Sequence, residues 1–543
     1  MAYTARWVED PKQVNEFELR KIKRDGLDII EAIYEYAKTG YDSIPAEEFD
    51  LFKWAGVYRQ RPNDGHFMMR VRIPSGILTS RQARALAQIG QDFGRGLIDV
   101  TTRQAVQYHW LTIETLPVIF DRLAEVGMST TEACGDCPRT IVGNPLAGID
   151  PDELMDTSEL AFELNRFFLN NRDFSNLPRK YKMAITANVY NSINAEINDL
   201  AFTPAMKEID GEEVIGFHVM VGGGLSTAPH LAQQLDIFVR PEEVIRVAAG
   251  ITAVFRDYGY RKNRNRARLK FLVADWGAEK FLDVLKSEYI GPFPGRGEDK
   301  TVGWNAGYFT GVHKQKQPGL NYVGLSIPVG RTSAEEWFEL ARLADEYGDG
   351  SIRTCNTQNL VLPNIPDEKL EALLREPLLQ RITPRPKTFT GHAVSCTGIE
   401  FCNLAVVETK ERMRQIAQYL DEHVELDAPV RLHVSGCPRS CGQPQIADIG
   451  LQGAQVQTEE GGKDAYTIAL GGILGPGVAA FNTRLKGRVL ADETAPALVR
   501  LITVYKEGKR EGESFNAFLK RVGLEPFQQE LDAFLAESKE RAS

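Results

Sequence analysis

Alternating and helical patterns of apolar residues predict a chain in which strands and helices are mixed. Apolar residues recur at three- and four-residue spacing over residues 27–37, which is typical of a helix with one buried face. Residues 67–73 predict a strand, Thr79 can cap a helix that runs to about Phe93, and a second strand is expected over residues 97–100. This order of elements indicates an α+β unit.

The same pattern returns later in the chain in two blocks, each with its own constant offset. Ile73-Pro-x-Gly76 recurs as Ile327-Pro-x-Gly330, and Ile197-x-Asp199 recurs as Ile446-x-Asp448. Further matched pairs are Gln104 with Gln358 and Gly222-Gly223 with Gly471-Gly472. Self-similarity at a fixed spacing marks a structural repeat. We therefore expect an α+β fold that is internally duplicated around a pseudo-two-fold axis.

Composition and charge narrow the class of protein. The 543 residues, 43% hydrophobic and 25% charged, predict a globular protein of several domains. No apolar run reaches the roughly 18 residues that span a bilayer. The net charge of −10 argues against a general nucleic-acid binder. Because residues 1–24 are polar and charged, unlike a secretory signal, we expect a cytoplasmic location. We also expect a monomer.

Four of the seven cysteines are grouped in two pairs, Cys396-x5-Cys402 and Cys437-x3-Cys441. Four thiolates in this grouping are typical of an iron–sulfur cluster. Zinc is an alternative, although zinc sites favour closer Cys-x2–4-Cys pairs. Unligated thiols are a second alternative. Disulfides are a third, but they are rare in cytosolic chains.

The repeat places the cysteines in one copy only. Cys437 and Cys441 correspond to Asn188 and Ser192 in the first copy, and Arg431 corresponds to Lys182. We therefore expect the second copy to hold the metal and the first to serve another purpose, with the site at their junction.

The first copy carries cations at alternating positions. Arg70 and Arg72 flank Val71, and Lys180 and Lys182 flank Tyr181. Alternate residues of a strand share one face, and the neighbouring residues are apolar, so we expect these charges to be buried and to face an anion. A third series consists of Arg264, Arg266, Arg268 and Lys270. We expect it to form a strand whose charges are either solvated or bind a partner. Arg103 and Arg139 are further cations of the first copy.

These motifs together resemble the assimilatory sulfite and nitrite reductases, which carry sirohaem coupled to a 4Fe-4S cluster. The resemblance rests on the four cysteines, the repeat and the segments 102–109, 134–139 and 177–182. It implies ferredoxin-like (parachute) units plus two mixed α/β sirohaem-binding units. The implied divisions are a helical lead-in (1–60), a first ferredoxin-like half-repeat (61–130), a sirohaem- and substrate-binding repeat (131–310), a second ferredoxin-like half-repeat (311–385) and a cluster-bearing repeat with C-terminal helices (386–543).

The resemblance also implies roles for individual residues. Cluster ligands would be Cys396, Cys402, Cys437 and Cys441, and Cys441 would also bridge to the sirohaem iron. Residues around the substrate anion would be Arg70, Arg139, Lys180 and Lys182. Residues that bind or support the sirohaem carboxylates would be Arg103, Gln107, His109, Arg179, Arg268 and Lys270. Tyr58 and Cys134 match positions that some members link covalently; two unlinked pocket residues are the alternative.

The closest branch is that of the single-chain, ferredoxin-dependent sulfite reductases. The Lys180-Tyr-Lys182 pair resembles the sulfite-reducing members, whereas plant-type nitrite reductases tend to have asparagine at the second lysine. We therefore expect six-electron reduction of sulfite to sulfide, with nitrite reduction as the alternative. Ferredoxin is the expected donor and a flavoprotein the second choice, because no dinucleotide motif is evident. A zinc-stabilised binding module and a haem-free iron–sulfur carrier remain as competing classes.

Overall fold

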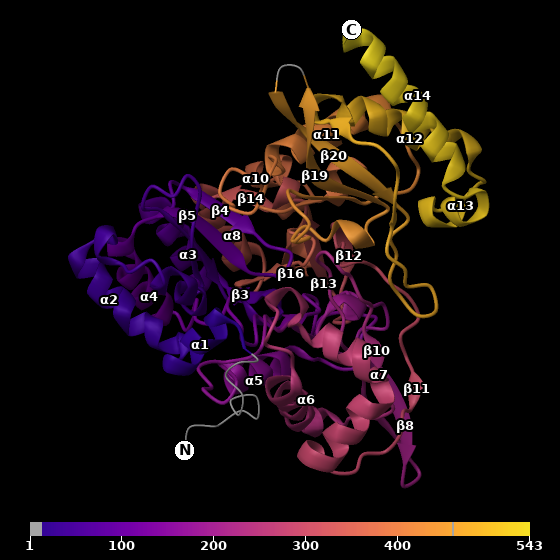
Figure 1. The fold of residues 1–543 in the computed structure, drawn as a ribbon. Helices are drawn as coiled ribbons and strands as arrows, with labels where there is room; N and C mark the ends of the chain where they lie inside the picture. The colour runs from indigo at the N-terminus through magenta and orange to yellow at the C-terminus, as the bar shows by residue number, and fades with distance from the viewer. Residues whose placement is uncertain (1–13, 459–460, 543) are drawn as a thin grey trace.

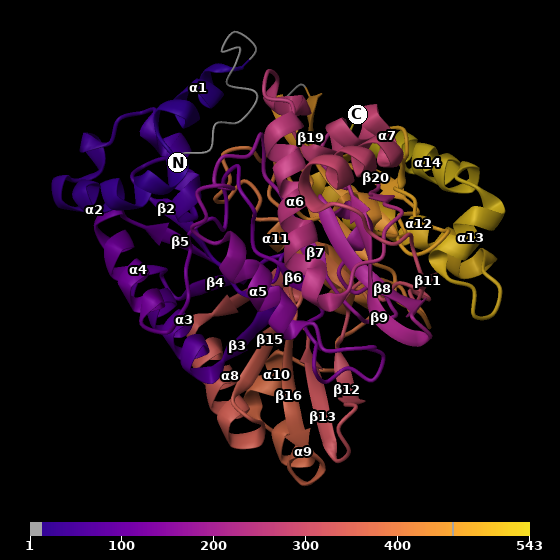
Figure 2. The same ribbon diagram turned by 90° about the horizontal axis from the view of Figure 1, so that it is seen from below.

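The computed structural model describes residues 14–458 and 461–542, which form four β-sheets covered by helices (Figure 1). Two sheets of five strands and two of six strands alternate along the chain. The five-stranded sheets form one layer of the molecule with helices α3 and α8, and the six-stranded sheets pack against them (Figure 2). The expected α+β duplication is confirmed.

Each five-stranded sheet takes one strand from the other half of the chain. The first sheet has the order β1 (Val57–Arg59), β2 (Phe67–Val71), β5 (Val106–Leu111), β4 (Leu97–Val100) and β14 (Arg331–Ser333). The other has the order β12 (Gly311–Lys314), β13 (Leu320–Leu325), β16 (Leu360–Pro366), β15 (Ser351–Thr354) and β3 (Ile77–Thr79). Because β3 and β14 are exchanged, neither half can complete its sheet alone.

The helices that follow the exchanged strands pack against each other. These are α3 (Ser80–Phe93) and α8 (Ala334–Tyr347). Both begin with a capping box, formed by Thr79 with Gln82 and by Ser333 with Glu336. The helix predicted from Thr79 to Phe93 is thus confirmed, and its repeat has the same N-terminus.

A pair of buried glutamines joins the two halves symmetrically. The Gln104 Nε2 donates to the Thr354 carbonyl at 3.1 Å, and the Gln358 Nε2 donates to the Val100 carbonyl at 3.0 Å. Both glutamines have a positive φ, 59° and 68°. The recurrence of Gln104 and Gln358 in the sequence therefore reflects one interaction that is made twice across the pseudo-two-fold axis.

The six-stranded sheets share a second topology, in which three parallel strands are followed by a long antiparallel hairpin. The first contains β6 (Val142–Gly143), β7 (Met183–Ile185), β8 (Leu200–Ile209), β9 (Glu212–Val221), β10 (Gln233–Gln234) and β11 (Glu298–Asp299). The second contains β17 (Ala393–Ser395), β18 (Leu432–Ser435), β19 (Ile449–Thr458), β20 (Gly461–Leu470), β21 (Thr483–Arg484) and β22 (Val489–Leu490).

Helices cover the outer faces of these sheets on opposite sides of the molecule (Figure 1). Those of the first sheet are α5 (Ser158–Phe168), α6 (Val244–Tyr258) and α7 (Leu269–Leu285), and those of the second are α11 (Lys410–His423), α12 (Thr494–Gly508), α13 (Phe515–Val522) and α14 (Glu525–Ala542). The remaining helices are α1 (Glu16–Lys23), α2 (Ile29–Thr39), α4 (Leu116–Ala124), α9 (Asp367–Leu374) and α10 (Pro377–Arg381). None of the described helices is both long and apolar enough to cross a membrane.

Three expectations from the sequence differ from the structure. Lys180 and Lys182 lie in a loop instead of a strand, and Tyr181 between them makes one isolated bridge to Pro138. Residues 264–266 form a 3₁₀ turn and α7 begins at Leu269, so the strand expected over 264–270 is wrong. The Asn263 side chain accepts from the Asn265 N–H and starts the turn, which the alternation of charges did not reveal. The helical lead-in also ends in strand β1, which pairs with β2 in the first sheet.

Candidate functional site

The four cysteines lie on two loops that leave the same edge of one sheet. Strands β17 and β18 are parallel neighbours, with Ser395 opposite Val434. Cys396 directly follows β17, and Cys437 follows β18 after one glycine. Because the carboxyl ends of parallel strands meet at one edge, the two loops are brought together there.

Close backbone contacts fix these loops against each other. The Gly436 N–H donates to the Cys396 sulfur at 3.2 Å, and the Thr409 hydroxyl donates to the Cys396 carbonyl at 2.8 Å. A Cβ at Gly442 would lie 2.0 Å from the Val434 carbonyl oxygen, so no side chain fits there. Backbone N–H groups aimed at thiolates are typical of iron–sulfur sites, where they tune the reduction potential.

The four thiols are electrostatic neighbours, although they are not packed around one point. Burial and the neighbouring Cys441 thiolate raise the pKa of Cys396 to about 12. Burial is the main cause that raises the pKa of Cys402 and of Cys437. The charge of Cys441 raises both further. Across residues 14–458 and 461–542, no three histidine, cysteine, aspartate or glutamate side chains could hold a single metal ion.

Two loops of the first copy hold three of the four expected substrate cations, Arg139, Lys180 and Lys182, and are hydrogen-bonded together. The Tyr181 N–H donates to the Cys137 carbonyl, and the Arg139 N–H donates to the Tyr181 carbonyl at 2.9 Å. The Tyr181 ring is buried and stacks on Phe255 with centroids 5.6 Å apart. Since Tyr181 points into the core, Lys180 and Lys182 on either side of it face away from that core.

Both lysines lack a partner for their charge within the described part of the chain. Neither Nζ atom makes a hydrogen bond or an ion pair there, and both side chains are half-buried. Burial, followed by the charges of Arg268 and Arg139, lowers the pKa of Lys180 to about 7. Burial and the charges of Lys180 and Arg103 lower the pKa of Lys182 strongly. The Thr102 hydroxyl of the first copy donates to the Cys441 carbonyl at 3.1 Å, and the charge of Cys441 raises the pKa of both lysines. The cysteine of one copy therefore lies near the cations of the other.

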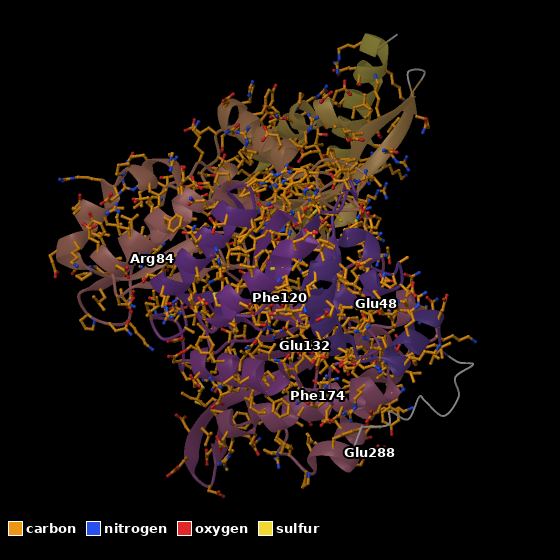
Figure 3. All side chains as sticks on the ribbon, turned by 90° about the vertical axis from the view of Figure 1, so that its left-hand side faces the viewer. Glu48, Arg84, Phe120, Glu132, Phe174 and Glu288 are labelled. Carbon is orange, nitrogen blue, oxygen red and sulfur yellow. The ribbon has the colours of Figure 1, made fainter. Side chains whose placement is uncertain are left out.

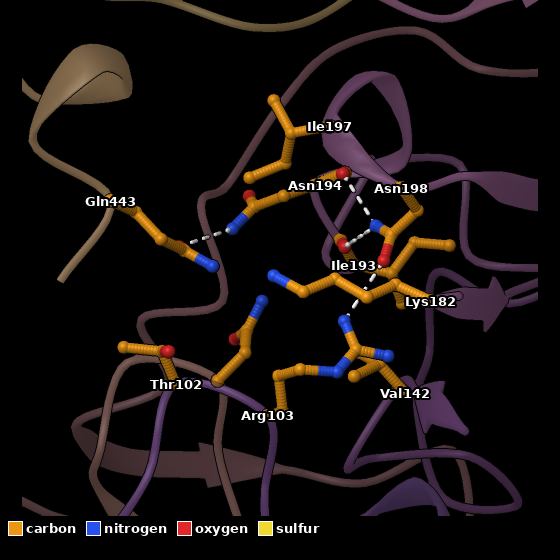
Figure 4. A pocket seen from close by; sticks show the side chains of 10 residues that line it. Thr102, Arg103, Val142, Lys182, Ile193, Asn194, Ile197, Asn198 and Gln443 are labelled. Atoms are coloured by element: carbon orange, nitrogen blue, oxygen red, sulfur yellow. Dashed lines mark hydrogen bonds between the residues drawn. The ribbon is translucent and has the colours of Figure 1, made fainter. Parts of the chain in front are cut away.

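Arg103 and Lys182 line a pocket between the two copies (Figure 4). The Arg103 guanidinium donates to Asn198 Oδ1 at 3.0 Å and to the Thr140 carbonyl at 2.8 Å. Burial, followed by the charge of Arg139, lowers the pKa of Arg103 to about 9. The far wall of the pocket is Gln443, whose Oε1 accepts from Asn194 Nδ2 at 3.4 Å.

Asp199, which the sequence did not assign to the site, supports this wall of cations. Its Oδ2 accepts from the Arg268 guanidinium at 2.7 Å and from the Lys182 N–H at 3.0 Å. Asp448 makes the same contact with the Arg431 N–H in the second copy. The repeated Ile-x-Asp motif was the signal that could have identified it.

Arg70 connects the loop 134–139 to the cluster side of the site. Its guanidinium donates to the Cys134 sulfur at 3.2 Å and to Gln107 Oε1 at 2.8 Å. Gln107 Nε2 in turn donates to the hydroxyl of Thr397, next to Cys396, at 3.0 Å. Burial and the neighbouring Cys134 raise the pKa of Tyr58, which places these two side chains side by side.

Three predicted supporting residues are held by protein groups. Arg179 donates to Asp136 Oδ1 at 3.2 Å, and Lys270 donates to the Leu225 carbonyl at 2.9 Å. His109 is fully buried and stacks on Phe401, with centroids 3.8 Å apart. These contacts fit a supporting role, and direct binding of a cofactor by these residues stays a prediction.

The cations that remain fit a polyanionic group. Buried Nε atoms of Arg70, Arg103 and Arg268 have no hydrogen-bond partner among the described residues, and the two lysines add unpaired charge. Burying unpaired cations is costly, so a ligand with several carboxylates would stabilise this surface. The donor set suits the eight carboxylates of sirohaem with a small oxyanion beside it.

Comparison with known proteins gives matches over nearly the whole chain. The model of the nitrite and sulphite reductase 4Fe-4S domain matches residues 134–292 and 389–539. The model of the nitrite/sulfite reductase ferredoxin-like half domain matches residues 58–126 and 313–379.

Individual relatives carry two different names. A ferredoxin–nitrite reductase of Synechococcus elongatus is 42% identical over 507 residues, which cover 92% of this chain and 97% of the relative. A ferredoxin sulfite reductase of Mycobacterium tuberculosis is 39% identical, with coverage of 94% and 95%. The solved structure of the M. tuberculosis NirA protein superposes with a TM-score of 0.91 at 37% identity, and covers 97% of this chain and 99% of that one.

Proposed function

Because this chain belongs to the family of nitrite and sulfite reductases, we propose that it reduces sulfite to sulfide with six electrons taken from ferredoxin. The family match establishes an oxidoreductase of this class. The choice of sulfite is carried by one observation, the second unpaired lysine at position 182.

The protein binds sirohaem and a 4Fe-4S cluster, as the family does. When bound, these groups store the electrons and offer the iron that takes the substrate. We infer that Cys396, Cys402, Cys437 and Cys441 would hold the cluster, and that Cys441 would also serve the sirohaem iron. The nearness of Cys441 to Lys180 and Lys182 supports this, because it joins the metal-binding copy to the cationic copy.

The cations of the first copy bind and protonate the substrate. Arg70 and Arg139 orient the oxyanion through fixed guanidinium groups, since the first is held by Gln107 and the second by the Gly135 carbonyl at 2.9 Å. Lys180 and Lys182 donate protons to the oxygens that leave as water. The lowered pKa of Lys180, about 7, favours donation near neutral pH.

Nitrite is the second candidate substrate, because the S. elongatus relative is 42% identical over 92% of this chain and is named a nitrite reductase. Both substrates are small oxyanions that need six electrons and several protons. Sulfite carries more negative charge than nitrite when deprotonated. A bound dianion favours the protonated form of Lys182 against the effect of burial, so this lysine stabilises sulfite more than nitrite. On this ground we favour sulfite.

Lys182→Asn is expected to lower kcat/KM for sulfite more than for nitrite. One charge-assisted contact is worth about 1.5–3 kcal/mol, so the sulfite value should fall about 10–100-fold relative to the nitrite value. The measurement is turnover of both ions by one preparation, with a chemical reductant. Lys262→Asn, at an exposed lysine of the same copy, is the matched control. Equal losses for the two ions would remove the basis for preferring sulfite.

Ferredoxin is proposed as the donor because the relatives that share most of the chain are named after it. A flavoprotein donor is the alternative. Turnover supported by reduced ferredoxin, and not by a reduced flavoprotein of matched potential, is the expected result.

A further inference from the structure

A cluster of six charged side chains, four of them buried, lies between helix α1 and the two substrate loops. Its carboxylates are Glu18 and Asp136, and its cations are Lys21, Arg179, Arg261 and Arg264. The side chains of Glu18, Lys21, Asp136 and Arg261 are at most 2% exposed. Figure 3 shows the molecule from the side on which the N-terminal helices lie. Glu48, which is labelled there, forms an ion pair with Arg24 at 2.6 Å.

Lys21 is the member that touches all three segments. Its Nζ lies 2.8 Å from Glu18 Oε1 on its own helix and 3.3 Å from Asp136 Oδ2 in the loop 134–139. The same atom donates to the Leu177 carbonyl, at the start of the loop 177–182, at 2.8 Å. One ammonium group therefore fixes the helix and both loops at a single point.

Asp136 completes the connection between the loops. Its backbone carbonyl accepts from the Leu177 N–H at 2.9 Å, and its carboxylate lies 2.8 Å from Arg264 Nη1 and 3.2 Å from Arg179 Nη1. These cations hold the pKa of Asp136 well below its usual range despite burial, so the carboxylate stays charged. Removing one partner from such a buried network leaves uncompensated charge and moves the groups around it.

The cluster lies close in sequence to the groups that face the substrate. Asp136 lies between Cys134 and Arg139, and Leu177 precedes Lys180 by three residues. A shift of either loop at the cluster would change the distance between the Arg139 guanidinium and the two lysine ammonium groups. Displacements of about 1 Å can cost about 10²-fold in rate when they disturb bound geometry.

We propose that Lys21 and Asp136 are positioning residues, through which helix α1 sets the spacing of the two loops that bind the substrate oxyanion. This inference rests on the proposed function only in that the pocket binds an oxyanion, whether sulfite or nitrite. It makes the N-terminal helix part of the substrate site, although α1 contributes no side chain to the pocket lining.

Lys21→Met keeps the length of the side chain and removes its charge. We expect KM for sulfite and nitrite to rise about ten-fold or more, while sirohaem and iron content per chain stay unchanged. The second readout is binding without turnover, in which sulfite titrated into the oxidised holoenzyme shifts the absorption spectrum at correspondingly higher concentration. Lys23→Met, two residues along the same helix at an exposed lysine, is expected to match the unaltered protein in every measurement.

Further variants separate positioning from stability. Lys21→Arg should restore most of the anion affinity, because it returns a cation to the cluster. If Lys21→Met does not fold, Arg264→Gln, at a residue whose side chain is 28% exposed, should raise KM in the same way. The proposal is overturned if the folded variants lose cofactor or thermal stability while KM and the anion titration per loaded site stay unchanged. If the unaltered enzyme reduces neither ion, the proposed function fails, and the anion titration still decides the role of Lys21.

Discussion

Cys441→Ser is expected to remove both the colour and the activity of the protein. Cys441 lies at the junction of the two copies, where its charge acts on Cys396, Lys180 and Lys182. A serine hydroxyl is a poor ligand for iron at neutral pH, so both the cluster and its link to the sirohaem iron should be lost. Since groups that merely support ligands already cost about 10–100-fold on substitution, we expect activity below about 1%.

The measurements are the visible absorption spectrum, the iron and sulfide content, and sulfite turnover. Cys355→Ala is the matched control, because Cys355 is a buried free thiol that packs with Leu146 and Val361 in a separate apolar cluster. It should keep the spectrum and the turnover. A Cys441→Ser protein with an unchanged spectrum and full turnover would contradict both the cluster assignment and the shared thiolate.

The features that the sequence predicted are those whose cause is local or is repeated. The capping residue Thr79 and the apolar spacing that follows it define helix α3, and both recur at Ser333. The recurrence of Gln104 as Gln358 indicated two copies before any contact between them was known. The two cysteine pairs indicated an iron–sulfur cluster, which the match to the 4Fe-4S domain confirms, while the four individual ligands stay a prediction.

The features that the sequence did not predict depend on distant partners. Strands β3 and β14 have three residues each, too short to show a pattern, and their exchange depends on the neighbouring sheet. Asp199 reaches Arg268 over 69 residues, and Asp136 reaches Lys21 over 115. Such ion pairs form only in the folded chain. The sequence therefore could not show which cations are neutralised by a carboxylate of the protein and which remain unpaired and able to bind a ligand.

The two copies show how one structural unit came to have two different uses. Lys182 and Arg431 occupy matching positions, and the N–H of each is held by a matching aspartate. The Arg431 guanidinium is neutralised by Asp448 at 2.6 Å and lies 4.1 Å from the Trp304 ring centroid. The Lys182 ammonium has no such partner among the described residues. The second copy has therefore neutralised the charge that the first copy keeps available for an anion.

Lys180→Met is expected to lower sulfite turnover by roughly 10²-fold or more, as the loss of a general acid commonly does. In the protein chain, burial and the charges of Arg268 and Arg139 lower the pKa of Lys180 to about 7. Bound carboxylates and thiolates would favour the charged lysine and raise this value. As pH rises through that pKa, the lysine loses the proton that it donates, so kcat/KM should fall on the alkaline side of neutrality.

Comparison of Lys180→Met with Lys180→Arg separates proton donation from charge. Arginine stays protonated at all accessible pH values, so Lys180→Arg should recover much of the substrate affinity and lose the alkaline fall in kcat/KM. It should not recover the full rate, because a guanidinium does not release its proton near neutral pH. The measurement is the pH profile of kcat/KM between pH 6 and 9 for the unaltered protein, both variants and the exposed-site control Lys262→Met. An alkaline fall that persists unchanged in Lys180→Arg would show that another group titrates, and Lys182, whose pKa is also lowered by burial and by Lys180, would then be the residue to replace.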